Sequence, residues 1–163
     1  MRAMAIHLTF LGHSGFIVEA GPDRIVLDPF LTGNSLATMG PGDVIGKTIA
    51  LTHGHADHAR SGHAHVMATP ETLAIMETRY GEYAESTPVQ HGEVMRVGEV
   101  DVSFVPAGHV LGSAQIILDH AGERVVVTGD YKRRPDPTCA PFQPVPCDLD
   151  KVPRTCMSCQ GAP

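Results

Sequence analysis

Residues 51–58 read LTHGHADH, so three histidines and one aspartate lie close together directly after an apolar run. Side chains two positions apart on an extended segment point to the same side, so His53 and His55 can bind one ion. The turn that follows directs Asp57 and His58 toward a second ion. We therefore predict a site for two metal ions at the end of a buried strand, because several imidazoles and a carboxylate are costly to pack together without a cation.

Short apolar runs separated by turn residues lie on both sides of this cluster and predict strands. The first three runs predict an antiparallel meander, and later runs predict two hairpins with turns at Gly98-Glu99 and Ala121-Gly122. The run that leads into the cluster predicts a fully buried strand. The predicted strands are residues 5–12, 14–20, 24–29, 47–53, 65–69, 93–97, 99–107, 113–120 and 123–130.

A single helix is predicted after Thr69, which can cap the first turn, with Pro70 inside that turn and Gly81 at the end. Its apolar face holds Leu73, Met76 and Tyr80. Strands, one helical crossover and further strands indicate an α/β fold with a mixed sheet and a helix on one face. Residues 30–46 are rich in Gly, Pro, Ser and Asn and predict a long loop of the kind that often lies near a functional site.

Two further candidate metal ligands follow predicted strands. His109 occurs in PAGHVLGS and Asp130 in VVVTGDY. Because strand ends bring side chains to a shared edge, we expect both residues to join the cluster, which spreads the ligand set over three strand ends. The other candidate histidines are interpreted as surface or hydrogen-bonded side chains; they are His7, His63, His65, His91 and His120.

The end of the chain differs in composition from the rest, being rich in proline and then without periodicity. We predict one metal-binding domain over residues 1–134 and an irregular surface tail over residues 135–163. All four cysteines lie in this tail; they are Cys139, Cys147, Cys156 and Cys159. They are expected to be free thiols in a reducing compartment, and a zinc site built from them is the alternative.

The charge balance argues against a broad nucleic-acid-binding surface. The chain has 12 Lys and Arg against 18 Asp and Glu, a net charge of −6 with neutral His, whereas phosphates are bound chiefly by Lys and Arg. A local basic patch is compatible with this charge. No apolar run reaches the roughly 18 residues needed to cross a bilayer, and the N-terminal residues lack the order of a signal peptide. We expect a cytoplasmic protein without membrane contact.

The motifs L-T-H-G-H-A-D-H, A-G-H and T-G-D together resemble those of the metallo-β-lactamase superfamily of metal-dependent hydrolases, over roughly residues 5–148. The resemblance implies an αβ/βα sandwich with its active site at one edge of two sheets. It implies that the first ion is bound by His53, His55 and His109. It implies that the second is bound by Asp57, His58 and a bridging Asp130.

The resemblance also suggests supporting residues, each with an alternative interpretation. Asp28 resembles an aspartate that holds a ligand His through its other ring nitrogen; otherwise it is a turn residue before Pro29. His13 either lines the pocket or is a histidine in a turn between strands. Three cations follow Asp130, and they either hold substrate phosphates beside the ions or form a solvated turn; they are Lys132, Arg133 and Arg134.

Two parts of the chain resemble different branches of the superfamily. Residues 5–53 resemble hydrolases related to ascorbate-phosphate lactonase, and residues 53–148 resemble exonucleases associated with DNA ligase, which are relatives of the mRNA 3′-end-processing nucleases. The chain is interpreted as a hybrid, through recombination, laboratory assembly or divergence, and as truncated, because the superfamily continues with a second half that supplies a last His to the second ion. Half a sandwich would leave an apolar sheet face in water, so we expect a homodimer.

These features predict a hydrolase with two divalent ions, zinc or alternatively manganese or iron, which share a water and lower its pKa from 15.7 toward about 7. The metal-bound hydroxide would attack phosphorus or a carbonyl carbon, with Asp57 and His58 as the candidate catalytic residues. The expected activity is that of a phosphodiesterase or nuclease acting on nucleic acid. The alternatives are hydrolysis of lactones, thioesters or other small carbonyl substrates, and a metal-binding domain with weak or no activity.

Overall fold

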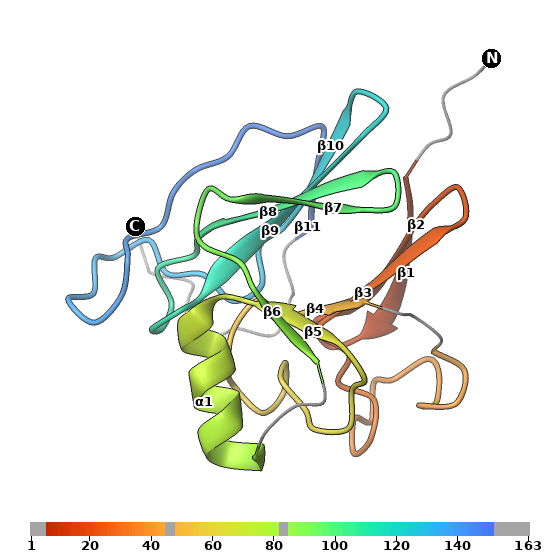
Figure 1. Ribbon diagram of the computed structural model, residues 1–163, viewed down its shortest axis with the longest axis horizontal. Coiled ribbons are helices and arrows are strands. Elements are labelled where there is room, and N and C mark those ends of the chain that lie inside the picture. The colour runs from red at the N-terminus through yellow and green to blue at the C-terminus, as the bar shows by residue number, and fades with distance from the viewer. Residues whose placement is uncertain (1–5, 45–47, 82–84, 152–163) are drawn as a thin grey trace.

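The structure is a computed structural model, and it describes residues 6–44, 48–81 and 85–151. The strands of these residues form two sheets that face one another, with a helix on the outside of one of them (Figure 1). The residue patterns alone predict one mixed sheet. The structure instead divides the strands between two sheets, as the resemblance to a two-sheet sandwich implies.

The first sheet has the strand order β1-β2-β3-β4-β5-β6. Its strands are β1 (His7–Gly12), β2 (Gly15–Ala20), β3 (Asp23–Leu27), β4 (Thr48–Ala50), β5 (Val66–Ala68) and β6 (Ser86–Pro88). The antiparallel pairing of β1, β2 and β3 confirms the predicted meander. From β3 to β6 all neighbours are parallel, so the ends of β3 and β4 point to the same edge of the sheet.

The second sheet has the order β11-β10-β9-β8-β7. Its strands are β7 (Val94–Val97), β8 (Val100–Pro106), β9 (Ala114–His120), β10 (Glu123–Val127) and β11 (Leu149–Lys151). Both predicted hairpins are confirmed, and Gly98, Ala121 and Gly122 have the positive φ angles that tight turns require. The tail, for which little regular structure is expected, contributes the short strand β11, which pairs parallel with β10.

The helix α1 (Pro70–Tyr80) matches its sequence prediction. Thr69 is the N-cap and accepts a hydrogen bond from the Thr72 amide, and Gly81 caps the other end with a φ of 85°. The α1 side chains Leu73, Met76 and Tyr80 pack in one hydrophobic cluster with the outer face of the first sheet. None of the helices in the described part of the chain has the length and apolar character needed to cross a membrane.

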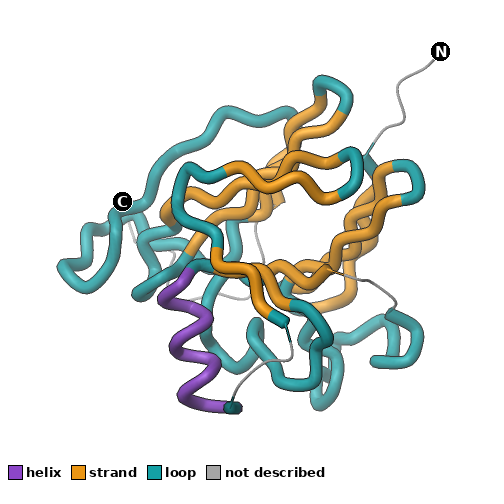
Figure 2. The backbone as a smooth tube through the Cα atoms, in the orientation of Figure 1, coloured by secondary structure: helices purple, strands orange, loops and turns teal. Residues whose placement is uncertain are grey.

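The main core lies between the two sheets. It contains alternate residues of both, among them Phe16, Val18, Ile25 and Leu27 from the first and Val102, Phe104, Ile116 and Leu118 from the second. Alternation with period two places these side chains on the facing surfaces. Long connections lie outside the sheets (Figure 2), including the predicted loop after β3.

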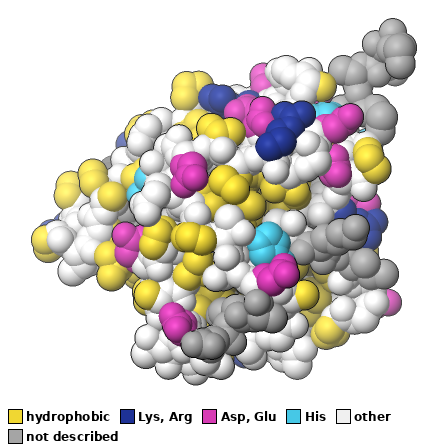
Figure 3. All heavy atoms as spheres, viewed as in Figure 1, with side chains coloured by type: hydrophobic (Ala, Val, Ile, Leu, Met, Phe, Trp, Pro, Cys, Tyr) yellow, Lys and Arg dark blue, Asp and Glu magenta, His cyan; other side chains and the backbone are white. Residues whose placement is uncertain are grey.

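The outer face of the second sheet is also apolar. Val105, Ile117 and Val126 form a small cluster there, and Val145 and Cys147 of the tail pack against it. The tail thus covers part of the sheet face that the sequence analysis expected to lie in water. On the side seen in Figure 3, hydrophobic side chains are visible in the middle, with charged side chains distributed around them. The homodimer stays a prediction.

Replacing Phe104 by Ala should lower the free energy of unfolding by roughly 3–5 kcal/mol, because this fully buried ring fills the space between the sheets. Denaturant unfolding followed by circular dichroism measures the change. Phe10→Ala is the matched control, since Phe10 is 50% exposed, and it should cost at most about 1 kcal/mol. Equal losses in the two variants would show that the inter-sheet core is not the main source of stability.

Candidate metal centre

The candidate ligands come from connections that meet at one edge of the two sheets. His53 to His58 follow β4, Asp28 follows β3 and His13 lies in the β1–β2 turn. From the second sheet, the β8–β9 connection carries His109 and the end of β10 carries Asp130. The fold therefore brings together residues that are up to 117 positions apart in the sequence.

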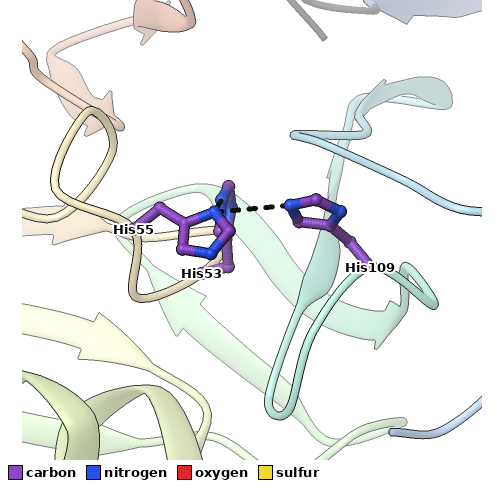
Figure 4. Close-up of side chains that lie close together, drawn as sticks. All are labelled: His53, His55 and His109. Carbon is purple, nitrogen blue, oxygen red and sulfur yellow. Dashed lines mark hydrogen bonds between the residues drawn. The ribbon is translucent and has the colours of Figure 1, made fainter. Parts of the chain in front are cut away.

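Three imidazoles form the first ligand group. His55 Nδ1 lies 3.1 Å from His53 Nε2 and 3.4 Å from His109 Nε2, and the ligand atoms of the three residues lie within 4.8 Å of one another (Figure 4). Two nitrogens bound to one tetrahedral zinc ion are about 3.3 Å apart when each Zn–N bond is about 2.0–2.1 Å. The spacing of this group therefore suits a single ion.

The second group combines imidazole and carboxylate. His58 Nε2 lies 4.0 Å from Asp57 Oδ2 and 3.7 Å from Asp130 Oδ1, and the other oxygen of Asp130 lies 3.7 Å from His109 Nε2. Asp130 thus has one oxygen toward each group, which is the arrangement of a bridging ligand. His13 adds to this group, because its Nε2 lies 3.0 Å from Asp57 Oδ2.

A buried carboxylate orients His58. Asp28 Oδ2 accepts hydrogen bonds from His58 Nδ1 at 2.8 Å and from the Thr52 hydroxyl at 2.6 Å, and Oδ1 accepts one from the Thr52 amide at 2.8 Å. Asp28 and His58 are both fully buried. Since Nδ1 donates to Asp28, only Nε2 of His58 faces the ligand groups, and no hydrogen-bond partner of this buried atom is found in the described residues.

The loop after β4 is held in place by α1. Arg79 donates a hydrogen bond to the Gly54 carbonyl, and the Tyr80 hydroxyl donates to the Ala59 carbonyl at 3.1 Å. A side chain at Gly54 would approach Ile75 Cγ2 to 2.9 Å, so glycine allows the close packing of loop and helix. The histidines therefore lie on a loop that hydrogen bonds and close packing attach to α1.

The surroundings change the protonation of these side chains. Burial lowers the pKa of His53, and the neighbouring His58, His55 and His109 lower it further, so this imidazole stays neutral with a lone pair available to a metal. Burial also lowers the pKa of His109. Burial acts against the charged form of His58 as well, but the carboxylates of Asp28, Asp130 and Asp57 together outweigh it and raise the pKa of His58.

The predicted cationic residues do not join the ligand groups. Lys132 Nζ donates to Asp136 Oδ2 at 2.7 Å, although its charge still lowers the pKa of His109. Arg133 and Arg134 are exposed, and no contact between them and the ligand groups is found in the described residues. Their exposure agrees with a solvated turn, and a role in holding substrate phosphates stays a prediction.

The remaining sequence candidates lie elsewhere. Cys139 is a free cysteine, Cys147 packs on the outer face of the second sheet, and Cys156 and Cys159 lie outside the described residues. A cavity of about 510 Å³ beyond the ligand loop is lined in part by Arg60, His63 and His65. The contact between His13 and Asp57 was not predicted from the sequence. The one indication of it in the sequence is a histidine in a tight turn next to Gly12.

The residues present fit a pair of metal ions. The donor set consists of imidazole nitrogens and carboxylate oxygens, which bind zinc, manganese and iron. The inward Nε2 of His58 is buried without a hydrogen-bond partner in the described residues, and a cation would satisfy it. Two of the three ligand groups include His58, so this residue connects the halves of the centre.

Asp28→Asn should weaken metal binding by about 10–100-fold, the usual effect of losing the partner of a metal-bound histidine. Whichever way the new amide turns, its NH₂ group faces a donor of Thr52 or His58. Titration of the metal-free protein with zinc against a chromophoric chelator measures the affinity. Asp101→Asn, at an exposed ion pair with Arg96, is the control and should leave the affinity unchanged. Equal affinity in Asp28→Asn and the unmodified chain would contradict the orienting role.

A family model and several curated proteins match this chain. A model of the β-lactamase superfamily domain matches residues 7–116. A UPF0173 metal-dependent hydrolase of Thermus thermophilus is 31% identical over 139 residues, which cover 77% of this chain and 61% of that protein. A UPF0173 metal-dependent hydrolase of Archaeoglobus fulgidus is 33% identical over 143 residues, covering 76% and 60%. The chain thus spans about three fifths of the length of these relatives.

Solved structures share the fold. Igni18, described as a metallo hydrolase from Ignicoccus hospitalis, superposes with a TM-score of 0.61 at 23% identity and covers 77% of this chain and 62% of its own. CmlA, a diiron β-hydroxylase from Streptomyces venezuelae, superposes with a TM-score of 0.59 at 17% identity, over 77% of this chain and 29% of its own. Because these two structures have different activities, their similarity to this chain is evidence for a shared fold and not for a shared reaction.

The comparisons do not support a division into lactonase-like and exonuclease-like segments. The Thermus thermophilus protein matches 77% of the chain, which is more than either segment contains, so one set of relatives accounts for both. The matched region holds β1 through β8 and the loop with His109. With its two-sheet fold and this match over residues 7–116, the chain belongs to the metallo-β-lactamase superfamily.

Proposed function

We propose that this chain carries the metal centre of a metal-dependent hydrolase. The observation that carries the proposal is the convergence of His53, His55 and His109, whose ligand atoms lie within 4.8 Å of one another at a sheet edge. Neutral imidazoles at this spacing can all coordinate one cation, whereas hydrogen bonds between the rings use only some of their nitrogen lone pairs. The names of the Thermus and Archaeoglobus relatives, metal-dependent hydrolases, agree with this proposal.

Each ligand residue has a separate task in this proposal. His53, His55 and His109 would hold the first ion, His58 and Asp57 would contribute to the second, and Asp130 has one oxygen toward each group. Bound divalent ions would supply water that ionises near neutral pH, with a pKa lowered from 15.7 toward about 7. Asp57, which is 44% exposed on its side chain, is placed to accept a proton from that water and to orient it. Asp28 holds His58 in the tautomer that leaves Nε2 open.

We propose a phosphodiester as the first substrate class. Lys132 pairs with Asp136, but its positive charge still acts on His109. Arg133 and Arg134 follow it in an exposed turn, so positive charge is available after β10 on this side of the centre. A phosphoryl group placed there would meet positive charge beside the ions. The net charge of −6 favours a small or single-stranded phosphodiester over a long duplex.

A second candidate is a carbonyl substrate with an apolar group. A groove of about 450 Å³ lies between α1 and the loop that carries His109, and it is lined in part by Ala74, Ile75 and Leu111. Leu111 is 50% exposed although it is only two positions from a ligand. An acyl chain or lactone ring could bury this surface while its carbonyl lies at the centre.

Activity should require both the ions and their ligands. His53→Ala should reduce kcat/KM by about 100-fold or more, because the first ion loses a ligand at the point where three imidazoles meet. Hydrolysis of bis(p-nitrophenyl) phosphate, compared with a panel of lactones and thioesters, measures the activity and separates the two substrate classes. His65→Ala is the matched control, since His65 pairs with Thr87 away from the centre, and it should retain full activity.

Three outcomes decide the matter. Faster turnover of the phosphodiester supports the first class, and faster turnover of the carbonyl panel supports the second. Bound metal without turnover of any of these substrates would support a metal-binding domain with weak or no activity. Activity that survives in His53→Ala would come from a contaminant and would overturn the proposal.

Dialysis against a chelator should abolish turnover, and stoichiometric zinc, manganese or iron should restore it. The physical reason is that the buried Nε2 of His58 has no hydrogen-bond partner in the described part of the chain and that three imidazoles converge beside it, so a bound cation would complete the centre. Metal analysis before and after dialysis, paired with the same assay, identifies the ion. Undiminished turnover in a metal-free sample would contradict a metal-dependent reaction.

A further inference from the structure

His13 lies beside Asp57 and His58, the candidate ligands of the second ion. Its Nε2 is 3.0 Å from Asp57 Oδ2, and the ligand atoms of His13, Asp57 and His58 all lie within 4.8 Å of one another. This group is separate from the one formed by His53, His55 and His109. The separations of 3.0 and 4.0 Å around Asp57 lie on either side of the roughly 3.3 Å expected across a tetrahedral zinc ion.

The backbone holds His13 in this position. His13 follows Gly12 in the turn between β1 and β2 and has a φ of 56°, an uncommon value for a residue with a side chain. A Cβ on Gly12 would lie 2.1 Å from the Leu36 carbonyl oxygen, so the turn packs directly against the loop after β3. Thr38 braces it further, with its amide donating to the Leu11 carbonyl at 3.1 Å.

The side chain of His13 is enclosed as well. It is 18% exposed, and Phe30 meets it edge to face with ring centroids 5.4 Å apart. A strained turn that fixes a mostly buried imidazole against Asp57 is unnecessary for a hairpin, which a Gly-Asn or Asn-Gly turn would close more easily. The placement therefore points to a role at the centre.

We infer that His13 is a ligand of the second metal ion, together with Asp57 and His58. The inference rests on the proposed function, because it assigns a further ligand to the same centre. In the metal-free protein Nε2–H donates to Asp57. A bound ion would need the lone pair of Nε2, so the single ring proton of the neutral imidazole would have to lie on Nδ1 instead.

His13→Asn removes the imidazole and keeps a residue that suits the backbone of this turn. Asn tolerates a positive φ, but its side chain is shorter than the imidazole and its amide is a poor ligand for zinc. We expect the metal-free protein to take up two zinc ions and His13→Asn to take up one, with the affinity for the second ion reduced by about 100-fold or more. Mass-spectrometric metal analysis and a chelator titration measure both quantities.

The control is His7→Asn, because His7 is an exposed histidine on the adjacent strand and should leave both ions bound. Two ions with unchanged affinity in His13→Asn would overturn the inference, as would loss of an ion in His7→Asn or a single ion in the unmodified chain. Failure of the proposed function looks different, since the unmodified chain would then bind no ion or bind ions without turning over any substrate.

A measurement on the unmodified chain covers the case in which His13→Asn does not fold. Diethyl pyrocarbonate modifies accessible imidazoles, and mass spectrometry locates the modified residues. The second equivalent of zinc should protect His13, whereas His7 should react at the same rate throughout. Equal modification of His13 with one and with two equivalents would overturn the inference.

Discussion

Imidazole nitrogens that approach one another closely are the constraint around which this structure is organised. His55 Nδ1 lies 3.1 Å from one ring nitrogen and 3.4 Å from another, so lone pairs must share protons or a cation. Burial keeps His53 neutral and removes water as a competing partner. A divalent ion would reduce the repulsion between these lone pairs more than shared protons can, because it interacts with all of them at once.

The orientation of the second group depends on one buried carboxylate. Asp28 accepts hydrogen bonds from Thr52 and His58 and is itself fully buried, so the charge is stabilised by donors on the adjacent strand end. The parallel pairing of β3 with β4 puts Asp28 and Thr52 side by side. Sheet topology thus determines the direction in which His58 Nε2 points.

The sandwich explains why so many distant residues meet. Both sheets end at the same edge, and the connections there need not pack into the core, so they are free to carry polar side chains. The first sheet contributes a rigid loop braced by α1, and the second contributes His109 and Asp130 on connections that begin in well-paired strands. A groove lined by Ala74, Ile75 and Leu111 lies between α1 and the connection that carries His109.

The sequence by itself determined the local features of the protein. Turn residues between alternating runs predicted the hairpins, Thr69 and Gly81 predicted the helix ends, and the spacing from His53 to His58 predicted a cluster, because each of these depends on neighbours a few positions apart. The division into two sheets followed from the resemblance and not from any periodic pattern. Only the tertiary structure decided the pairing of β11, the contact of His13 with Asp57 and the engagement of Lys132 by Asp136. Two of these three depend on residues or strands distant in the sequence, and the third on which neighbour a flexible cation selects, so no periodic pattern could indicate them.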